Sequence, residues 1–172
     1  VLTIDAKTGK YARCVYSDVI ATTSSVGSVT PAIELLGVYN GNDEYGEIFG
    51  DKDLTADRPI VAVKMNNIEN ASAVYVALST DKYVDVAALP DRYIIADFRG
   101  YWQTLQTLAV PYHFFVSDWD VEQTVVAYAQ DANGNEGQVG KLGVTPVSAG
   151  DINELKAYVE EVNSAIPQVA KS

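Results

Sequence analysis

The sequence predicts a mainly β fold, a two-sheet sandwich followed by one amphipathic helix. Apolar segments of strand length recur at intervals of roughly 10–15 residues, separated by turns rich in Asn, Asp and Gly. The chain has 11 Tyr and 2 Trp, with abundant Val and Thr, and these residue types favour strands. Hydrophobic residues make up 48% of the 172 residues, so we expect a packed core rather than a disordered chain.

Most of the middle of the chain is predicted as strands. These are 32–39, 59–65, 71–79, 92–98, 102–108, 111–117 and 123–130, with a short exit strand at 142–145. The run 59–65 is almost wholly apolar, which predicts a core strand. Asn40-Gly41 predicts a turn, and 81–91 is compatible with a loop containing one helical turn. Because side chains alternate along a strand, the following residues are expected to face inward: Ile33, Leu35, Val61, Val63, Val74, Val76, Ile94, Phe114, Val116, Val126 and Tyr128.

Two segments precede the predicted sandwich domain at 31–146. Residues 24–30 are small and polar, which predicts a linker. Residues 1–23 have an apolar strand, an Asp-Ala and Gly turn, and a second strand that ends in Thr, and the same order recurs late in the chain. We therefore predict that 1–23 is the closing hairpin of a preceding module. The chain does not begin with Met, so we expect a piece of a longer protein.

Residues 147–172 predict a helix and a tail. Asp151 is a candidate N-cap, and Glu154 follows it at the spacing of a capping box. The apolar residues then recur on one helical stripe, at Ile152, Leu155, Val159, Val162 and Ile166. Pro167 ends the pattern. Such a stripe can pack on the sandwich or associate with a second copy of the chain.

The segment 123–145 carries the most specific pattern. A strand containing Tyr128 enters the turn Asp131-Ala-Asn-Gly-Asn135, and a shorter strand leaves toward Pro146. This resembles the last two strands of a fibronectin type III or related immunoglobulin-like sandwich, and the resemblance extends over roughly 31–146. It implies that Tyr128 anchors a corner through its hydroxyl group. The family usually carries a Trp on its second strand, which 59–65 lacks, so Met65 or Tyr75 would fill that volume.

Charge and cysteine content narrow the possible partners. The formal net charge is -11, so we expect no nucleic-acid partner and no attraction to an anionic membrane. No apolar run is long enough to cross a bilayer. Cys14 is the single cysteine, and the chain has no Cys/His cluster, so we expect no disulfide within the chain, no metal and no cofactor. Acidic, Cys-poor modules of this kind resemble exported surface lipoproteins of Bacteroides-type bacteria, which implies the cell surface or the periplasm.

Catalytic and metal-binding patterns are weak, and we predict no enzyme activity. The single histidine, His113, lies in an apolar strand, which favours a structural role, and no Gly-x-Ser-x-Gly motif is present. Asp118 and Asp120 would suit glycoside hydrolysis, but a turn whose Asp side chains bond to backbone amides explains them better. The turn 131–135 matches the first ligands of a calcium loop but lacks the final Glu. The acidic loop 40–47, together with Asp51 and Asp53, is a second weak candidate.

Two aromatic clusters remain as candidate binding residues. They are Tyr101, Trp102 and Gln103, and Asp118, Trp119 and Asp120. Aromatic rings beside Asp and Gln can stack on a sugar and bind its hydroxyl groups, although both Trp side chains can equally complete the rim of the core. We predict a non-catalytic adhesion, spacer or glycan-handling module of an exported bacterial protein. Its expected partner is a glycan or another surface protein, with self-association through the hairpin or the helix as a further option.

Two alternative functions stay open. The first is a carbohydrate-binding module that uses Trp102 and Trp119, with both indoles exposed on one face. The second is an accessory domain of a glycoside hydrolase, which a pocket joining Asp97 to Asp118 or Asp120 would favour.

Overall fold

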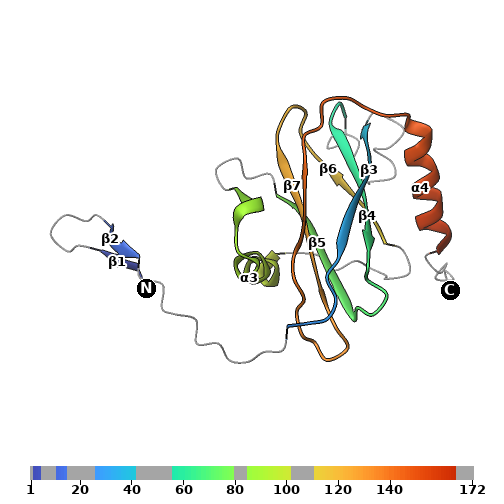
Figure 1. Cartoon of the computed structure of the whole chain (residues 1–172). Coiled ribbons are helices and arrows are strands. Elements are labelled where there is room, and N and C mark those ends of the chain that lie inside the picture. The colour runs from blue at the N-terminus through green and yellow to red at the C-terminus, as the bar shows by residue number, and fades with distance from the viewer. Residues whose placement is uncertain are drawn as a thin grey trace, which may run out of the picture.

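Two antiparallel sheets of three strands and two α-helices form the body of the protein in a computed structural model, which confirms the predicted mainly β sandwich (Figure 1). The structure describes residues 2–4, 11–14, 26–41, 56–79, 85–101 and 111–165, and only the backbone of 2–4, 11–14 and 98–101. In chain order the elements are β1 (Leu2–Ile4), β2 (Tyr11–Cys14), β3 (Ala32–Asn40), β4 (Pro59–Asn66), β5 (Ala73–Ser79), η1 (Val86–Ala88), α3 (Asp91–Tyr101), β6 (Tyr112–Val116), β7 (Gln123–Gln130), β8 (Gly140–Val144) and α4 (Ile152–Ala165).

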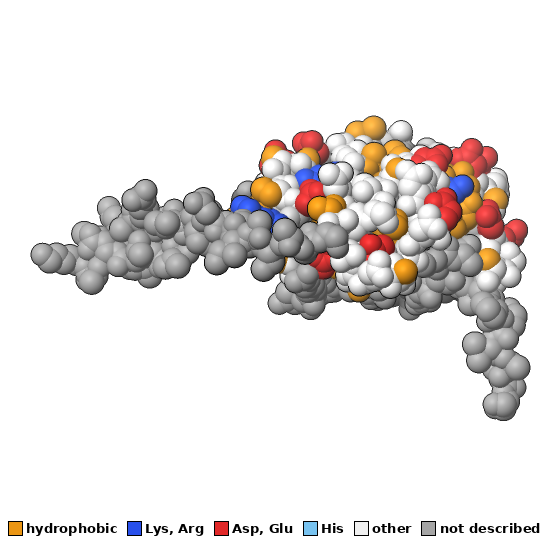
Figure 2. All heavy atoms as spheres, turned by 60° about the horizontal axis from the view of Figure 1, so that its bottom comes forward, with side chains coloured by type: hydrophobic (Ala, Val, Ile, Leu, Met, Phe, Trp, Pro, Cys, Tyr) orange, Lys and Arg blue, Asp and Glu red, His pale blue; other side chains and the backbone are white. Residues whose placement is uncertain are grey.

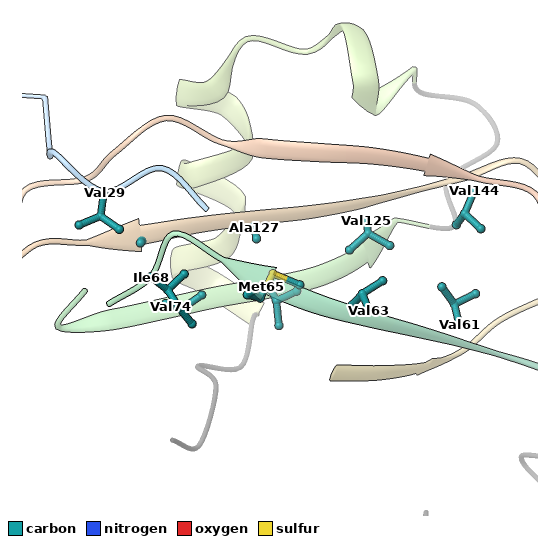
Figure 3. Close-up of a cluster of buried hydrophobic side chains, with 11 residues drawn as sticks. Val29, Val61, Val63, Met65, Ile68, Val74, Val125, Ala127 and Val144 are labelled. Atoms are coloured by element: carbon teal, nitrogen blue, oxygen red, sulfur yellow. The ribbon is translucent and has the colours of Figure 1, made fainter. Parts of the chain in front are cut away.

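The chain passes repeatedly from one sheet to the other. The first sheet has the order β3-β4-β6 and the second the order β5-β7-β8. A central hydrophobic cluster lies between them, and Figure 3 shows Val63 and Met65 of β4 beside Val125 and Ala127 of β7. The strands β1 and β2 pair with each other in a separate sheet and belong to neither sheet of the sandwich.

The middle strands β4 and β7 are apolar on both faces because both faces are covered. On β4, Val61 and Val63 belong to the central cluster, whereas Ile60 and Ala62 face the other way. Both sets are buried completely. The same alternation holds on β7, and it explains why these strands read as continuous apolar runs rather than as alternating ones.

The two helices cover the outer faces of the sheets, on opposite sides of the molecule in Figure 1. Leu155 and Val159 of α4 pack on the outer face of the first sheet against Tyr39 of β3. Ile94 of α3 packs on the outer face of the second sheet against Tyr128 of β7. The body therefore has four layers, in the order helix, sheet, sheet, helix.

The predicted strand at 92–98 is wrong, because these residues lie in the helix α3. Pro90 precedes the helix, and Asp91 in its first turn suits the positive end of a helix dipole. Lys141 of β8 holds this region in place, since its Nζ donates to the carbonyl of Leu89 at 2.5 Å and lies 3.5 Å from Asp91 Oδ1. The single turn expected within 81–91 is the 3₁₀ helix η1, and the strand expected at 102–108 lies outside the described residues.

A bulge in β3 changes which side chains face the core. The pairing of β3 with β4 shifts between Leu35 and Gly37. Leu35, which was expected to face inward, precedes the shift and pairs with Val63, but it lies on an edge strand and is 42% exposed. Tyr39, which follows the shift, is fully buried in the outer cluster beneath α4. Gly37 makes room for that ring, since a Cβ atom there would lie 2.5 Å from the Tyr39 hydroxyl oxygen.

The other residues expected to face inward divide between the layers. Val61, Val63, Val74 and Val76 lie in the central cluster, and Ile33 packs against it. Four others pack in the outer clusters beneath the helices instead, namely Ile94, Val126, Tyr128 and Phe114. Val116 is partly buried. Simple alternation assumed one apolar layer, and the helices add two more.

The helix α4 begins directly after Asp151, whose Oδ1 accepts a hydrogen bond from the backbone N–H of Asn153 at 2.9 Å. The Glu154 carboxylate accepts a hydrogen bond from the Tyr39 hydroxyl at 3.2 Å, which ties the helix to β3. Burial, followed by this carboxylate, raises the pKa of Tyr39 above its ordinary value. Ile166 and Pro167 lie outside the described residues.

The surface agrees with the acidic composition. On the face shown in Figure 2, acidic side chains are spread among apolar and neutral ones, and basic side chains are few. Within the described ranges, no helix has the length and apolar character needed to cross a membrane.

Candidate functional site

Only one of the two predicted aromatic clusters falls within the described side chains. Tyr101 is the last residue of α3, where only the backbone is described, and Trp102 and Gln103 lie outside the described residues. Asp118, Trp119 and Asp120 form the turn between β6 and β7. This turn sits at the end of the sandwich where β6 finishes and where β4 and β7 begin.

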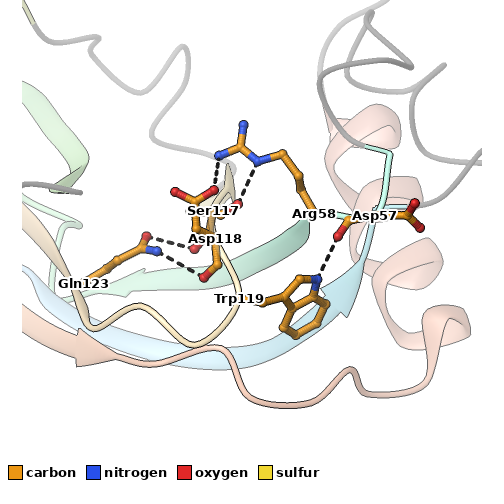
Figure 4. A network of polar contacts seen from close by, with 6 residues as sticks. All are labelled: Asp57, Arg58, Ser117, Asp118, Trp119 and Gln123. Atoms are coloured by element: carbon orange, nitrogen blue, oxygen red, sulfur yellow. Dashed lines mark hydrogen bonds and ion pairs between the residues drawn. The ribbon is translucent and has the colours of Figure 1, made fainter.

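The turn belongs to a polar group that we call the end cluster, made of Asp57, Arg58, Ser117, Asp118, Trp119 and Gln123 (Figure 4). Its contacts join the residues before β4 to the turn after β6. Arg58 makes two of them, because its Nε donates to the Ser117 carbonyl and its Nη2 to Asp118 Oδ1, both at 2.9 Å. The Arg58 and Asp118 side chains are 35% and 52% exposed, so this ion pair adds little stability by its charge alone.

The most buried part of the end cluster is the pair Ser117 and Gln123. Ser117 is fully buried and Gln123 is 2% exposed. The Ser117 hydroxyl donates to Gln123 Oε1 at 2.8 Å, and Gln123 Nε2 donates to the Asp118 carbonyl at 3.3 Å. Buried polar groups that lose their partner destabilise a protein strongly, so this pair fixes the turn to the base of β7.

Trp119 is half-buried, and its indole contacts the segment before β4. The Nε1–H group donates to the backbone carbonyl of Asp57 at 2.8 Å. Asp57 and Asp120 both have positive φ values, 56° and 57°. Aspartate adopts this region more readily than most residues. The two bends lie on either side of the contact between the Trp119 indole and the segment before β4. In this arrangement Trp119 contributes to holding the end of the sandwich together.

The carboxylates considered for catalysis lie in different settings. Asp118 is bound to Arg58 on the β6–β7 turn, and Asp120 is exposed, with its backbone N–H donating to the Pro146 carbonyl at 2.8 Å. Asp97 lies on the exposed side of α3, over the outer face of the second sheet.

In the turn 131–135, considered above as a calcium loop, the Asp131 carboxylate binds backbone N–H groups of the turn itself. Asp131 Oδ1 accepts backbone hydrogen bonds from Asn133 at 2.8 Å and from Asn135 at 3.0 Å. These contacts, with that from Asn135 first, lower the pKa of Asp131. Gly134 has a φ of 78°, as a tight hairpin turn requires. Over the described ranges, no group of three or more His, Cys, Asp or Glu is arranged to hold a metal ion. The acidic loop 40–47, together with Asp51 and Asp53, lies almost entirely outside the described residues.

The single histidine is partly buried on β6. His113 pairs with Val63 across β6 and β4, and its ring centre lies 4.5 Å from that of Phe115. Burial lowers the pKa of His113 to about 4, so the imidazole is neutral at pH 7. This setting accords with the structural role favoured by the apolar sequence around it.

Arg58, Ser117 and Gln123 had no role in the sequence-based prediction. Each is a common polar residue beside an apolar strand, and no motif distinguishes it. One signal was present, because Ser117 and Gln123 bracket the Asp-Trp-Asp turn at the two points where apolar strands end and begin. Polar residues at both bases of a turn often bond to each other across it.

Comparisons with known proteins give little further information. No protein-family model matches the chain, and no curated protein matches it. Among solved structures, the chain is similar to a beta-1,2-glucanase from Parabacteroides distasonis, with 14% sequence identity and a TM-score of 0.39. That match covers 81% of this chain and 16% of the glucanase chain. A likeness at this level does not determine an activity.

Proposed function

We propose that the chain is a non-catalytic immunoglobulin-like module of an exported bacterial surface protein, and that it acts as a spacer or adhesion module. The observation that carries this proposal is the use of the polar and aromatic side chains at the end cluster. Ser117, Gln123 and the Trp119 indole all bond to neighbouring parts of the same chain. Their contacts maintain the fold, which is what a scaffold requires of the end of a sandwich.

The strand order supports the immunoglobulin-like type. If the strands of that fold are lettered A to G, β3, β4 and β6 correspond to A, B and E. Likewise β5, β7 and β8 correspond to C, F and G. The connection between β5 and β6, where such domains carry further edge strands, contains η1 and α3 here.

The four-layer build favours a mechanical role over a ligand pocket. Both outer sheet faces are covered by helices of the same chain, and the central cluster is filled by aliphatic side chains. Among the described residues, the surfaces left to a partner protein or glycan are the ends of the sandwich, the edges of its sheets and the outer surfaces of the helices. The proposed exported location, at the cell surface or in the periplasm, rests on the resemblance to surface lipoproteins, because a single cysteine suits a cytosolic protein as well as an exported one without disulfides.

A glycan array tests the proposal against its main alternative. The wild type, Trp102→Ala and Trp119→Phe would be applied to the same array, after circular dichroism has shown that all three are folded. Trp119→Phe keeps an aromatic ring but removes the N–H that binds the Asp57 carbonyl. A spacer gives no glycan signal above background for any of the three proteins.

Two results would overturn the spacer proposal. Wild-type binding to a defined glycan that is lost in Trp102→Ala would establish a carbohydrate-binding module. Release of reducing sugar from that glycan by the wild type would establish an enzyme. The array can include β-linked glucans among its polysaccharides, so that both alternatives are tested on the same materials.

A further inference from the structure

The residues that precede β3 do not form a free linker. Residues 26–31, which we call the strap, lie along the connection between β7 and β8 (131–139) and the first residue of β8, Gly140. The backbone N–H of Gly27 donates to the Glu136 carbonyl at 2.7 Å. The backbone of Ser28 also forms a hydrogen bond with the Asp131 carboxylate. The polar composition of 24–30 predicted a linker, but its described part is docked on the sandwich.

Glycines make this docking possible, because the two backbones touch. A Cβ atom at Gly137 would lie 1.8 Å from the Val29 carbonyl oxygen. One at Gly140 would lie 2.3 Å from the Pro31 carbonyl oxygen, and one at Gly27 would lie 2.3 Å from that of Asn135. Side chains essentially never approach so closely, so any larger residue at these positions must push the strap away.

Two apolar side chains of the strap, Val29 and Pro31, are buried. Val29 is 5% exposed and belongs to the central cluster, at the end opposite the end cluster (Figure 3). Figure 3 shows it near Ile68 and away from Val61 and Val144. The strap therefore closes one end of the space between the sheets. By contrast, Val26 at its start is 73% exposed.

We propose that the strap is a latch that opens as a unit, before the sandwich unfolds, and that it ties the chain upstream of Val26 to the β7–β8 hairpin. The strap is held by two buried apolar side chains, Val29 and Pro31, and by the backbone hydrogen bonds of Gly27 and Ser28, whereas the strands pack within four layers. Segments with few buried contacts open at lower free energy than the core of the same protein. Its use as a load-bearing joint rests on the proposed spacer function, but the latch itself does not.

Native-state hydrogen exchange on the full chain tests the latch. In the wild type, the Gly27 amide should be protected, yet should exchange well before the amide of Val63 in the central strand β4. Gly137→Ala should reduce the protection of the Gly27 amide by about tenfold or more and leave Val63 protected. Gly143→Ala is the matched control, because a Cβ atom there would meet nothing within 4 Å, and it should leave both amides unchanged.

A second variant keeps the test decisive if Gly137→Ala does not fold. Val29→Ala removes the buried side chain nearer to Gly27 without altering the glycines, and it should also reduce the protection of the Gly27 amide while Val63 stays protected. The proposal would be overturned if the wild-type Gly27 amide exchanged at the rate of an unstructured peptide, or only together with Val63. It would also be overturned if the folded variants exchanged as Gly143→Ala does.

The glycan array and hydrogen exchange test the spacer function and the latch separately. Glycan binding on the array would overturn the spacer function and would leave the exchange pattern of the strap as it is. Conversely, exchange of Gly27 together with β4 would remove the latch and would leave the array result as it is.

Discussion

Acidification should destabilise this protein through its single histidine. His113 lies on β6 opposite Val63, and antiparallel partners share a face, so its ring is directed toward the central cluster. Burial there lowers the pKa of the imidazole from 6.5 to about 4. Burial opposes the charged form because an imidazolium inside an apolar cluster loses the water that stabilises it.

The sign and size of the effect follow from this difference. Below about pH 6.5 the unfolded chain binds a proton at His113, whereas the folded protein binds it only as the pH approaches 4. The free energy of unfolding therefore falls as the pH decreases through this window. Each tenfold difference in proton affinity corresponds to about 1.4 kcal/mol, so the contribution lost is about 3 kcal/mol. Against a typical domain stability of about 5–15 kcal/mol, such a loss is easily measured.

Urea denaturation of the wild type and of His113→Leu, at a series of pH values from about 7.5 to 4, measures this contribution. Carboxylates also titrate toward the acidic end, but they do so in both proteins, so the difference between the two isolates the histidine. That difference should shift in favour of the variant by about 3 kcal/mol as the pH is lowered. Because the chain has one histidine, its proton NMR signal can be followed without assignment. A constant difference between the proteins, or a histidine signal that titrates near pH 6.5, would refute the reasoning.

Two further substitutions test the end cluster and the outer layer. Ser117→Ala leaves the buried Gln123 Oε1 without its donor and should lower the free energy of unfolding, measured by urea denaturation, by about 1–3 kcal/mol. An unchanged denaturation midpoint would show instead that water replaces the lost hydroxyl group. Leu155→Ala removes a fully buried side chain of α4 and should lower the free energy of unfolding by about 2–5 kcal/mol in the same assay. The control Glu160→Ala, at an exposed position of α4, should change it by no more than about 0.5 kcal/mol. Equal effects of the two substitutions would mean that α4 does not stabilise the sandwich.

The strands of the sandwich were largely predictable because their apolar runs are unambiguous. The segment 59–65 became β4 (Pro59–Asn66) and 123–130 became β7 (Gln123–Gln130). Turn residues marked their ends, as at Asp131 through Gly134. The sequence did not show why these strands are apolar along their whole length. A strand covered on both faces has no polar face, and the second cover of each sheet is a helix distant in the sequence.

The helix α3 shows where local pattern fails. Tyr93, Ile94 and Ile95 favour strands by intrinsic preference, and their succession gives no helical stripe. Tertiary packing decides the outcome, because Ile94 fills the outer face of β7 beside Tyr128. Pro90 followed by Asp91 was the available signal for a helix start. A preference of a few tenths of a kcal/mol per residue yields to one well-buried side chain.

The bulge in β3 is a second feature that alternation does not predict. Strict alternation from Ile33 places Leu35 and Tyr39 on one face, yet the extra residue before Gly37 sends Tyr39 to the outer cluster. A glycine within a strand pattern is the usual sign of such a bulge. Gly37 therefore indicated a bulge in β3. The sequence alone does not show that this glycine makes room for the ring of Tyr39.

Part of the end cluster was predictable from the sequence, but the contacts that join its residues were not. The sequence identified Asp118 and Trp119 as unusual, but not the partner of either. Trp119 bonds to a backbone carbonyl of a residue 62 positions away, and any residue type offers such a carbonyl. Arg58 likewise reaches across the fold to Ser117. Contacts of this kind are set by which strands neighbour one another, which no local motif encodes.

The cover of both outer sheet faces by helices limits where a binding site for a partner could arise on this protein. Three-stranded sheets have little area, and each gains stability here from a helix that hides its outer face. A binding site on either face would require that helix to leave, with the loss of Leu155 or Ile94 from its cluster. Changes at the ends meet a smaller obstacle, since the Arg58–Asp118 pair is partly exposed and contributes little by charge. New contacts should therefore arise first around Asp118 and Asp120, where substitution disturbs none of the three apolar clusters.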